Sequence, residues 1–458
     1  MILPRGTPGD TDTICAIATA TGGGIGVIRV SGPAAERILR QVVAGFPMDA
    51  ESHKLFYGQA RDPASGEVLD EVLACVMRAP RSYTGETVAE VHGHGGAANL
   101  ARILGAVVRS GARVAEPGEF TRRAFLAGRL DLSRAEAVAQ VIAARSERSL
   151  RVAQSQLQGA LARRVRSLRE PLVAALAEVE ARVDFPDEHL DFVPAAKVAR
   201  SLMQVAAEAE ALAATYDRGR VIVEGLDVAL VGRPNAGKSS LLNALVEAER
   251  ALVDAAPGTT RDFVEAEIEL AGVRVVLVDT AGERETTDSV ERRGLELGRR
   301  RRARADVVVV VVDGTLGFGE VEAGLAAVGD GVRVLVAWNK SDLAPVASGV
   351  PAELEWVATS AETGEGVVAL RSALGRLAEG AGGEIEEGLV VTSARQREAL
   401  AEAAAALRAG AAVLDREEPP ELAAVDLRVA LDRLGRISGE SVDASVLDAI
   451  FARFCIGK

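Results

Sequence analysis

Apolar positions along the chain follow two different periods, and the change between them divides the sequence into regions. In the first quarter of the chain, short apolar segments such as 13–19 and 26–30 alternate with glycine-rich turns, which predicts a small α/β domain. Residues 133–183 are rich in Ala, Leu, Arg, Gln and Glu, and the segment 133–136 has the sequence of a capping box. Long helices are therefore expected there, followed by another over about 194–216.

The pattern changes again at residue 221, where β-branched strands begin to alternate with loops. A glycine-rich segment at 379–383 is typical of a linker, and a second capping sequence at 393–396 opens another helical region. The helices before and after the middle section are expected to pack together, which makes that section an insertion. The predicted domains are an N-terminal α/β domain at 1–125, a helical domain made of 126–219 and 383–458, and an inserted α/β domain at 220–382.

One stretch of the inserted domain has the spacing of a phosphate-binding P-loop. The sequence G-x-x-x-x-G-K-S spans 232–239, between an apolar strand at 228–231 and a segment of helical periodicity. Glycines let backbone N–H groups surround phosphates, Lys238 can reach the outer phosphates, and Ser239 can ligate Mg²⁺. The predicted phosphate-binding residues are Asn235, Ala236, Gly237, Lys238, Ser239 and Ser240.

Further segments, in the order found in GTPases, narrow the ligand to GTP. A strand ends in the D-x-x-G segment 279–282, whose carboxylate can act on magnesium, and the loop 254–262 has the position of switch I. Another strand ends at 339–342 in N-K-x-D, whose carboxylate can accept both N–H donors of guanine, while the segment at 359–361 offers a backbone amide for the guanine oxygen. Residues 220–380 thus resemble the Ras-like translation-factor GTPases. The predicted contacts to GTP beyond the P-loop are Asp254, Ala255, Ala256, Pro257, Gly258, Thr259, Thr260, Asp279, Thr280, Ala281, Gly282, Asn339, Lys340, Ser341, Asp342, Ser360 and Ala361, with Thr260 as the second hydroxyl on magnesium.

Composition limits the remaining possibilities. A length of 458 residues favours about three domains, and the absence of a long apolar run or a signal pattern predicts a cytoplasmic protein with no membrane segment. Three widely spaced cysteines argue against a disulfide framework and against a clustered cysteine metal site. The net charge of −13 opposes broad attraction to nucleic acid, so any RNA contact is expected to be local or shared with a partner.

Several segments outside these motifs carry a more specific resemblance. Gly232 to Asn235, with 258–262 and 290–292, resembles the family of tRNA wobble-uridine modification GTPases called MnmE or TrmE. The resemblance extends over nearly the whole chain, through segments at 12–14, 23–32, 82–86, 92–96, 117–126 and 185–188. It implies an N-terminal α/β folate-binding-like domain, a helical domain and an inserted Ras-like P-loop GTPase domain.

The resemblance also implies how hydrolysis is achieved. Glu283 occupies the position of the water-orienting glutamine of Ras-type enzymes, and the family commonly has an apolar residue there. Members of the family instead orient water with a glutamate at the position of Glu291. They coordinate a potassium ion beside the phosphates, and their G domains pair across the nucleotide in a homodimer. The implied metal ligands are Ser239 and Thr260 for Mg²⁺, and Asn235, Asp254, Ala256 and Thr259 for K⁺.

A folate site in the N-terminal domain is the other implication. The resemblance predicts binding of 5-formyl- or 5,10-methylene-tetrahydrofolate through Arg29, Glu90, Arg129 and the chain terminus at Lys458. It also brings Cys455 to the pocket as a candidate catalytic thiol, with a buried structural cysteine as the alternative. Taken by themselves, the charged residues of this set are typical of surface ion pairs.

Two histidines raise a separate question. His92 and His94 are two residues apart and would share one face of a strand, as a metal pair requires. No third ligand is evident near them in the sequence, so packing in a turn or in the folate pocket is the favoured interpretation.

The predicted function is that of a potassium-dependent GTPase that modifies tRNA with a flavin-dependent partner of the MnmG (GidA) type, in a heterotetramer or larger complex. The product would be the 5-carboxymethylaminomethyl or aminomethyl group of wobble uridine. The alternative is a nucleotide-gated scaffold GTPase in RNA or ribosome assembly that carries out no one-carbon chemistry. Folate binding distinguishes the two.

Overall fold

The computed structural model describes residues 12–184, 192–250, 265–279, 305–317, 332–344, 354–383, 389–416 and 418–457, together with positions 319, 321, 325 and 328. The chain divides into two compact units, one made of the described parts of 1–139 and 431–458, the other of the described parts of 140–430. None of the helices in these ranges combines the length and the hydropathy that a transmembrane span requires.

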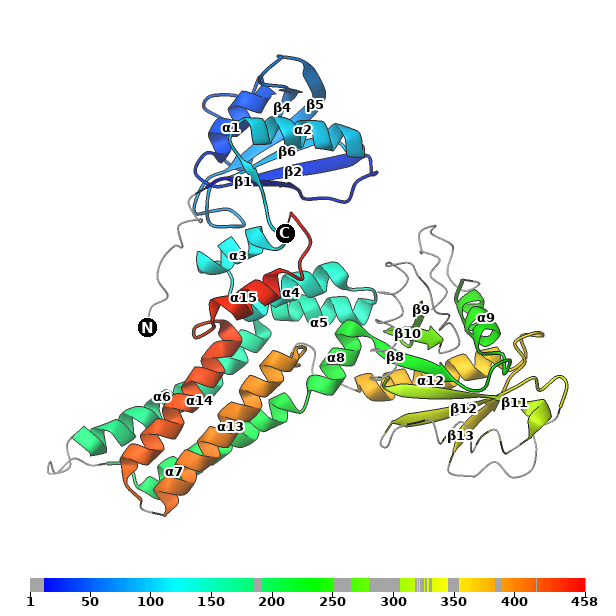
Figure 1. Ribbon diagram of the computed structural model, residues 1–458. Coiled ribbons are helices and arrows are strands. Elements are labelled where there is room, and N and C mark those ends of the chain that lie inside the picture. Colours follow the sequence, from blue (N-terminus) through cyan, green and yellow to red (C-terminus); the bar gives the residue numbers. More distant parts are fainter. Residues whose placement is uncertain are drawn as a thin grey trace. The chain divides into compact units, whose positions relative to one another are not determined.

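The N-terminal unit is built on a mixed sheet with the strand order β3-β4-β5-β6-β2-β1-β7. Neighbouring strands run antiparallel except for β1 and β7. Helices α1 and α2 cover one face of this sheet (Figure 1), and Ile28, Val91 and Ile103 are among the side chains of the core between them. The bounds are β1 Ile14–Ile17, β2 Ile25–Ser31, α1 Ala35–Val42, β3 Val43–Ala44, β4 Phe56–Arg61, β5 Val68–Met77, β6 Val88–His94, α2 Ala97–Arg109 and β7 Arg113–Val114.

Helices α3, α4 and α15 complete this unit. Gly118 precedes α3 with a φ of 69°, and a Cβ atom there would lie 2.5 Å from the carbonyl oxygen of Phe451, so α15 passes close to the start of α3. The chain then approaches the sheet, because a Cβ atom on Gly457 would lie 2.4 Å from the carbonyl oxygen of Ile17. The bounds are α3 Glu119–Leu126, α4 Leu132–Ala143 and α15 Ala444–Phe451.

The first predicted helix cap is wrong, whereas the second is confirmed. Ser133 lies inside the first turn of α4, and the Asp131 carboxylate accepts hydrogen bonds from its hydroxyl at 2.5 Å and from the Arg134 N–H at 3.0 Å. A charged acceptor two residues earlier thus caps the helix in place of the serine. Ser393 caps α13 (Ala394–Asp415) as predicted, since its side chain accepts the N–H of Gln396.

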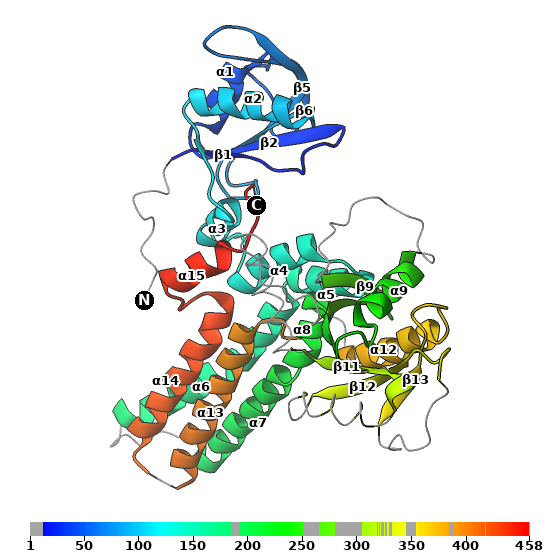
Figure 2. The ribbon, with the colours of Figure 1, turned by 45° about the vertical axis from the view of Figure 1, so that its right-hand side comes forward.

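The second unit begins with helices that lie beside one another in space although they are far apart in sequence. Helix α7 packs along both α6 and α13 (Figure 2), and Arg408 of α13 donates hydrogen bonds of 2.7 and 2.5 Å to the Glu210 carboxylate of α7. Helices from before and after the inserted domain therefore pack together, as predicted. The bounds are α5 Glu147–Leu157, α6 Ala160–Asp184, α7 Ala195–Ala213, α8 Tyr216–Glu224 and α14 Pro420–Ser438.

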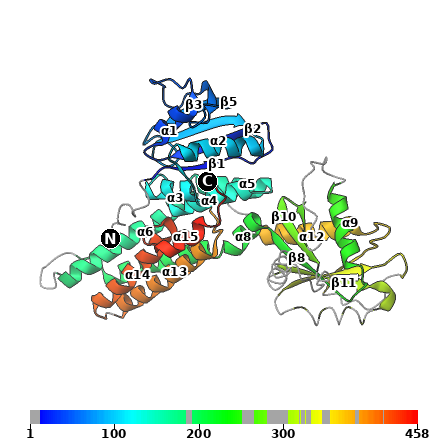
Figure 3. The ribbon, with the colours of Figure 1, turned by 45° about the horizontal axis from the view of Figure 1, so that its top comes forward.

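The inserted domain is a largely parallel sheet with the order β13-β12-β11-β8-β10-β9, in which only β9 runs antiparallel to its neighbour among the described strands. Helices α9 and α12 pack on one face (Figure 3), where Leu245, Leu277 and Leu370 are buried together. The bounds are β8 Leu226–Val231, α9 Lys238–Arg250, β9 Glu265–Leu270, β10 Val273–Asp279, β11 Val307–Asp313, β12 Arg333–Asn339, β13 Glu355–Ala358 and α12 Val367–Gly382.

The predicted start of the strands at residue 221 is wrong. Val221 and Ile222 belong to helix α8, and the first strand of the domain begins at Leu226. Both side chains are buried, Val221 against the core of the inserted domain and Ile222 against Val152 and Val390. Contacts on two sides of a helix thus override the strand preference of β-branched residues.

Candidate functional site

The P-loop connects β8 to α9, and its glycines are required by close backbone approaches. Gly232 has a φ of 152°, and a Cβ atom there would lie 2.2 Å from the carbonyl oxygen of Val311. Gly237 has a φ of 92°, and its Cβ atom would lie 2.2 Å from the Asn339 side-chain nitrogen. Neither position accepts a side chain without displacing its neighbour.

Lys238 and Ser239 begin α9, at the end of the helix where positive potential gathers. The Lys238 ammonium is buried and donates to the carbonyl oxygens of Gly232 and Arg233, both at 2.8 Å, and burial lowers the pKa of this lysine. The Ser239 hydroxyl donates to the Asp279 carboxylate at the end of β10 over 2.5 Å. The structure therefore brings together two predicted residues whose oxygen atoms suit Mg²⁺.

Asn339, at the end of β12, ties the P-loop to the segment after β13. Its side-chain N–H donates to the carbonyl oxygen of Ala236 at 2.9 Å, and its side-chain oxygen accepts the N–H of Ala361 at 3.1 Å. The N–H of Ser360 donates to the carbonyl oxygen of Glu365 at 2.8 Å. The two predicted amides for the guanine oxygen thus already have acceptors, so either would bind it by sharing or exchanging its hydrogen bond.

The other residues of the 339–342 segment differ in their contacts: Lys340 and Ser341 bond to neighbouring segments, whereas Asp342 is exposed. Lys340 pairs with Asp313 at the end of β11 over 2.5 Å; burial alone would raise the pKa of Asp313, but hydrogen bonds from Lys340 and Thr315 lower it. The N–H of Ser341 donates to the carbonyl oxygen of Thr359 at 3.1 Å. The Asp342 side chain is exposed at the same edge of the sheet, where a base can reach it.

Most of the predicted switch residues, and Lys458 of the predicted folate contacts, lie outside the residues that the structure describes. The structure describes Asn235, exposed in the loop with a φ of 66°, and Ser240, exposed on the first turn of α9. The predicted residues Asp254, Ala255, Ala256, Pro257, Gly258, Thr259, Thr260, Thr280, Ala281, Gly282, Glu291 and Lys458 lie outside the described residues, as does Glu283.

The N-terminal unit has a second constellation, on the sheet face opposite α1 and α2. Arg29 of β2 and Glu90 of β6 are direct cross-strand neighbours, and the guanidinium donates to the carboxylate at 2.9 Å. The rings of Tyr83 and Phe120 lie 5.6 and 5.9 Å from the Arg29 guanidinium, at cation–π distance. Two residues predicted for folate therefore form one partly buried ion pair against aromatic rings.

His92 and Cys75 extend this constellation. A nitrogen of His92 lies 3.1 Å from the second carboxylate oxygen of Glu90, and Cys75 of β5 is the cross-strand neighbour of Glu90. Hydrogen bonds to Cys75 and Glu90 raise the pKa of His92 to about 9. Burial alone would raise the pKa of Glu90, but His92 and Arg29 lower it.

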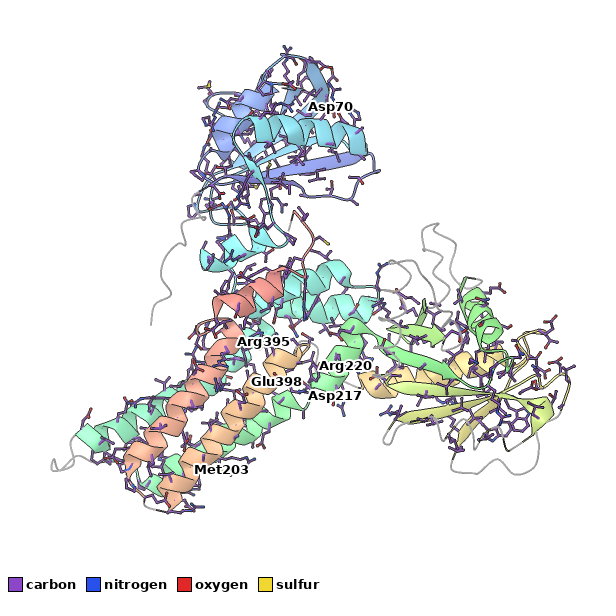
Figure 4. The ribbon with its side chains drawn as sticks, viewed as in Figure 1. Asp70, Met203, Asp217, Arg220, Arg395 and Glu398 are labelled. Atoms are coloured by element: carbon purple, nitrogen blue, oxygen red, sulfur yellow. The ribbon has the colours of Figure 1, made fainter. Side chains whose placement is uncertain are left out.

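The sequence did not indicate that Cys75 lies beside Glu90 and His92, and the two histidines do not form a pair. The Nδ1 atom of His94 lies 2.7 Å from a carboxylate oxygen of Asp70, the residue labelled in Figure 4, and His94 is not part of the cluster around Glu90. The alternation of apolar and polar residues along β5 and β6 indicates which face of the sheet each side chain occupies. It does not indicate the register between the strands, which places Cys75 beside Glu90.

The chain terminus and Arg129 also lie in this unit. Cys455 is exposed, and its carbonyl oxygen accepts the N–H of Gly118 at 3.5 Å, two residues before Phe120. The exposed Arg129 side chain passes Gly85, whose Cβ position lies 3.3 Å from its Cγ atom. The alternative of a buried structural cysteine at 455 is therefore wrong.

Known proteins resemble this chain over nearly its full length. Residues 13–129 match the family model of the GTP-binding protein TrmE N-terminus, and residues 132–455 match that of the MnmE helical domain. The tRNA modification GTPases MnmE of Synechococcus sp. (strain RCC307) and Geobacter metallireducens are 45% and 43% identical, over 98% of this chain and 98% and 99% of theirs. Among solved structures, the FeoB G-domain of Methanococcus jannaschii is 26% identical over 33% of this chain and 96% of that one, with a TM-score of 0.23.

Proposed function

The chain belongs to the MnmE family of tRNA modification GTPases, and on that premise we propose that it hydrolyses GTP during the modification of tRNA. The observation that carries the proposal is the P-loop, where a buried lysine and the Ser239–Asp279 pair meet at the start of α9. In this proposal Lys238 leaves the two loop carbonyls that it now contacts and binds the outer phosphates. Ser239 would hold Mg²⁺, with Asp279 acting on it through water, and the ion would supply positive charge to the phosphates.

Asp342 is the residue that selects guanine in this proposal. Its exposed carboxylate accepts the two N–H donors on one edge of the base. Asp342→Asn should weaken GTP binding and admit the xanthine nucleotide, whose carbonyl group matches the new amide donor. Unchanged GTP affinity in this variant, measured with a fluorescent GTP analogue, would contradict the assignment.

Hydrolysis depends on potassium and on Glu291 in this proposal, which the family resemblance motivates. Asn235, exposed in the P-loop, is one proposed K⁺ ligand, and Asp254, Ala256 and Thr259 are the others. Thr260 adds the second hydroxyl to Mg²⁺. Turnover should be faster in potassium than in sodium at equal ionic strength, and equal rates would refute the cation role.

The residue that orients water is tested by a separate pair of variants. Glu291→Ala should lose hydrolysis while it keeps GTP binding, and Glu283→Ala should retain most of both. The reverse pattern would exchange the two roles. Because both changes remove one carboxylate, the comparison is matched in charge.

The N-terminal unit supplies the one-carbon chemistry of the proposed reaction. Arg29, Glu90 and Arg129 would bind a 5-formyl- or 5,10-methylene-tetrahydrofolate, and Lys458 would contact it at the chain terminus. Because Arg29 pairs with Glu90 at 2.9 Å, both would contact the same end of the folate, where Glu90 would accept pterin N–H donors, while Arg129 would bind the glutamyl carboxylates. Cys455 would act on the transferred carbon, and its exposure keeps the thiol accessible. Working as a cytoplasmic homodimer, the protein would share the reaction with a flavin-dependent MnmG-type partner that supplies the redox step.

Two measurements decide between this function and a scaffold role. Nucleoside mass spectrometry of tRNA from cells that lack the gene should show loss of the 5-carboxymethylaminomethyl or aminomethyl group on wobble uridine. Intact modification in those cells would overturn the proposal. Isothermal titration without detectable folate binding would instead favour a nucleotide-gated scaffold.

A further inference from the structure

Three chemically different ligand groups meet on the open face of the N-terminal sheet. Cys75 and Glu90 are cross-strand neighbours on β5 and β6, and His92 follows Glu90 on the same face. One ligand atom from each, a sulfur, an oxygen and a nitrogen, lies within 4.8 Å of the other two. From this geometry, we propose that Cys75, Glu90 and His92 form a zinc-binding site with a fourth position open to water or to a ligand.

The spacing of the three atoms suits a tetrahedral ion. Zinc binds thiolate, imidazole and carboxylate at roughly 2.0–2.3 Å, which places pairs of ligand atoms roughly 3.3–3.8 Å apart. The ligand atoms lie within 4.8 Å of one another, so their separation exceeds the upper end of this tetrahedral spacing by at most about 1 Å.

Arg29 orients the Glu90 carboxylate, the proposed oxygen ligand of the ion. Its guanidinium binds one oxygen of Glu90 at 2.9 Å, while the other oxygen faces His92. Metal-bound carboxylates and imidazoles are commonly held by such outer hydrogen bonds, which fix their orientation. The Arg29 guanidinium packs against the rings of Tyr83 and Phe120. Its hydrogen bond to one oxygen of Glu90 leaves the other oxygen, which would bind the ion, facing His92.

Burial and charge agree with three protein ligands and one open position. Cys75 is 7% exposed, whereas the side chains of Glu90 and His92 are 15% and 25% exposed, so the cluster is sheltered yet reachable from solvent. The ion takes the place of the thiol proton of Cys75 and of any proton on the bound ring nitrogen, and these protons leave to solvent. Thiolate and imidazole favour zinc over magnesium or calcium.

The zinc site goes beyond the proposed function and does not depend on it. Glu90 is shared with the proposed folate contacts, so metal binding is measured without folate, and folate binding is measured on chelator-treated protein. Failure of the zinc site then leaves folate binding in chelator-treated protein unchanged, and loss of folate binding leaves the metal titration unchanged.

The test uses the full chain without a polyhistidine tag, stripped by a chelator and titrated with Co²⁺. One equivalent per chain should give the near-ultraviolet band of thiolate-to-cobalt charge transfer, and Zn²⁺ should remove it by displacement. Cys75→Ser should abolish the band. His92→Gln removes a direct ligand, so it should weaken binding by at least the roughly 10–100-fold that loss of an outer hydrogen-bond partner costs. The controls are Cys455→Ser, which removes an exposed thiol, and His94→Gln, which removes the neighbouring histidine; both should keep the band.

The outcome is decisive in either direction. Binding without the charge-transfer band, or a band that survives Cys75→Ser, would overturn the site and leave the three residues as a hydrogen-bonded cluster. His92→Gln keeps the test open if the serine variant fails to fold, because His92 is on the more exposed side of the cluster. Wild-type affinity in a folded His92→Gln variant would equally reject the proposal.

Discussion

The P-loop site and the site on the N-terminal sheet depend on different kinds of chemical groups. In the P-loop, the groups predicted to bind phosphate are mostly backbone N–H groups, and the glycines matter because they lack side chains. On the N-terminal sheet, the groups that matter are side chains from β2, β5 and β6. The first site should therefore fail when an atom is added, and the second when one atom is exchanged for another of the same size.

Addition of one methyl group at Gly237 should have the largest effect. In Gly237→Ala the new carbon meets the Asn339 amide at 2.2 Å and forces a residue with a side chain to a φ of 92°. Overpacking and backbone strain together cost about 2–6 kcal/mol, about 30- to 10⁴-fold in GTP affinity. Equilibrium binding of a fluorescent GTP analogue measures the loss.

The matched control for that variant is Gly319→Ala, because no atom of the described residues lies within 4 Å of the added carbon there. It should bind GTP like the unaltered protein. Equal affinity of the two variants would show that the P-loop tolerates a side chain, and the contrast with the sheet site would disappear.

Glu90→Gln should have the next largest effect, although it changes no volume. The variant loses the charged acceptor for the pterin N–H donors, a charge-assisted hydrogen bond worth about 1.5–3 kcal/mol, so folate affinity should fall by about 10–100-fold. Glu67→Gln is the matched control, since Glu67 and its partner Arg102 are both exposed and such pairs contribute little. Calorimetric titration that finds the same loss in both variants would contradict a specific role for Glu90.

Asn339→Ala sharpens the comparison, because it tests a side chain from outside the P-loop that holds the loop in place. The change removes the hydrogen bonds to Ala236 and Ala361 and should lower GTP affinity by about 1–2 kcal/mol, or about five- to thirtyfold. Asn243→Ala, on the exposed face of α9, should leave affinity unchanged. A full-affinity Asn339→Ala variant would mean that the loop keeps its geometry without this side chain.

The smallest expected effect is the pH dependence of the Asp313–Lys340 pair. Because the folded state lowers the pKa of Asp313 from its ordinary 3.8, the pair stabilises the inserted domain above that pH and loses its effect as pH falls through the lower folded value. Asp313→Asn should cost about 1 kcal/mol at neutral pH and flatten the dependence below pH 3.8. Urea unfolding followed by the fluorescence of Trp338 and Trp356, both in this domain, measures the change. A pH dependence identical to that of the unaltered protein would rule out the pair as its source.

The phosphate site could be predicted from the sequence because its chemistry is local. The spacing of Gly232, Gly237, Lys238 and Ser239 specifies a loop between a strand and a helix, and the structure has that loop. The same holds for Asn339 at the end of β12, since parallel strands end at one edge of a sheet. Local patterns were less reliable at element ends, where Asp131 replaced Ser133 as a cap and packing drew Val221 into a helix.

The sequence by itself thus determined the P-loop and the packing against one another of helices from before and after the inserted domain. Only the tertiary structure decided which residues meet across strands: His92 with Cys75 and Glu90, and His94 with Asp70. The physical reason is register. Alternation along a strand assigns each side chain to a face, but its neighbours depend on how two distant segments align, and that is fixed by the core on the opposite face of the sheet.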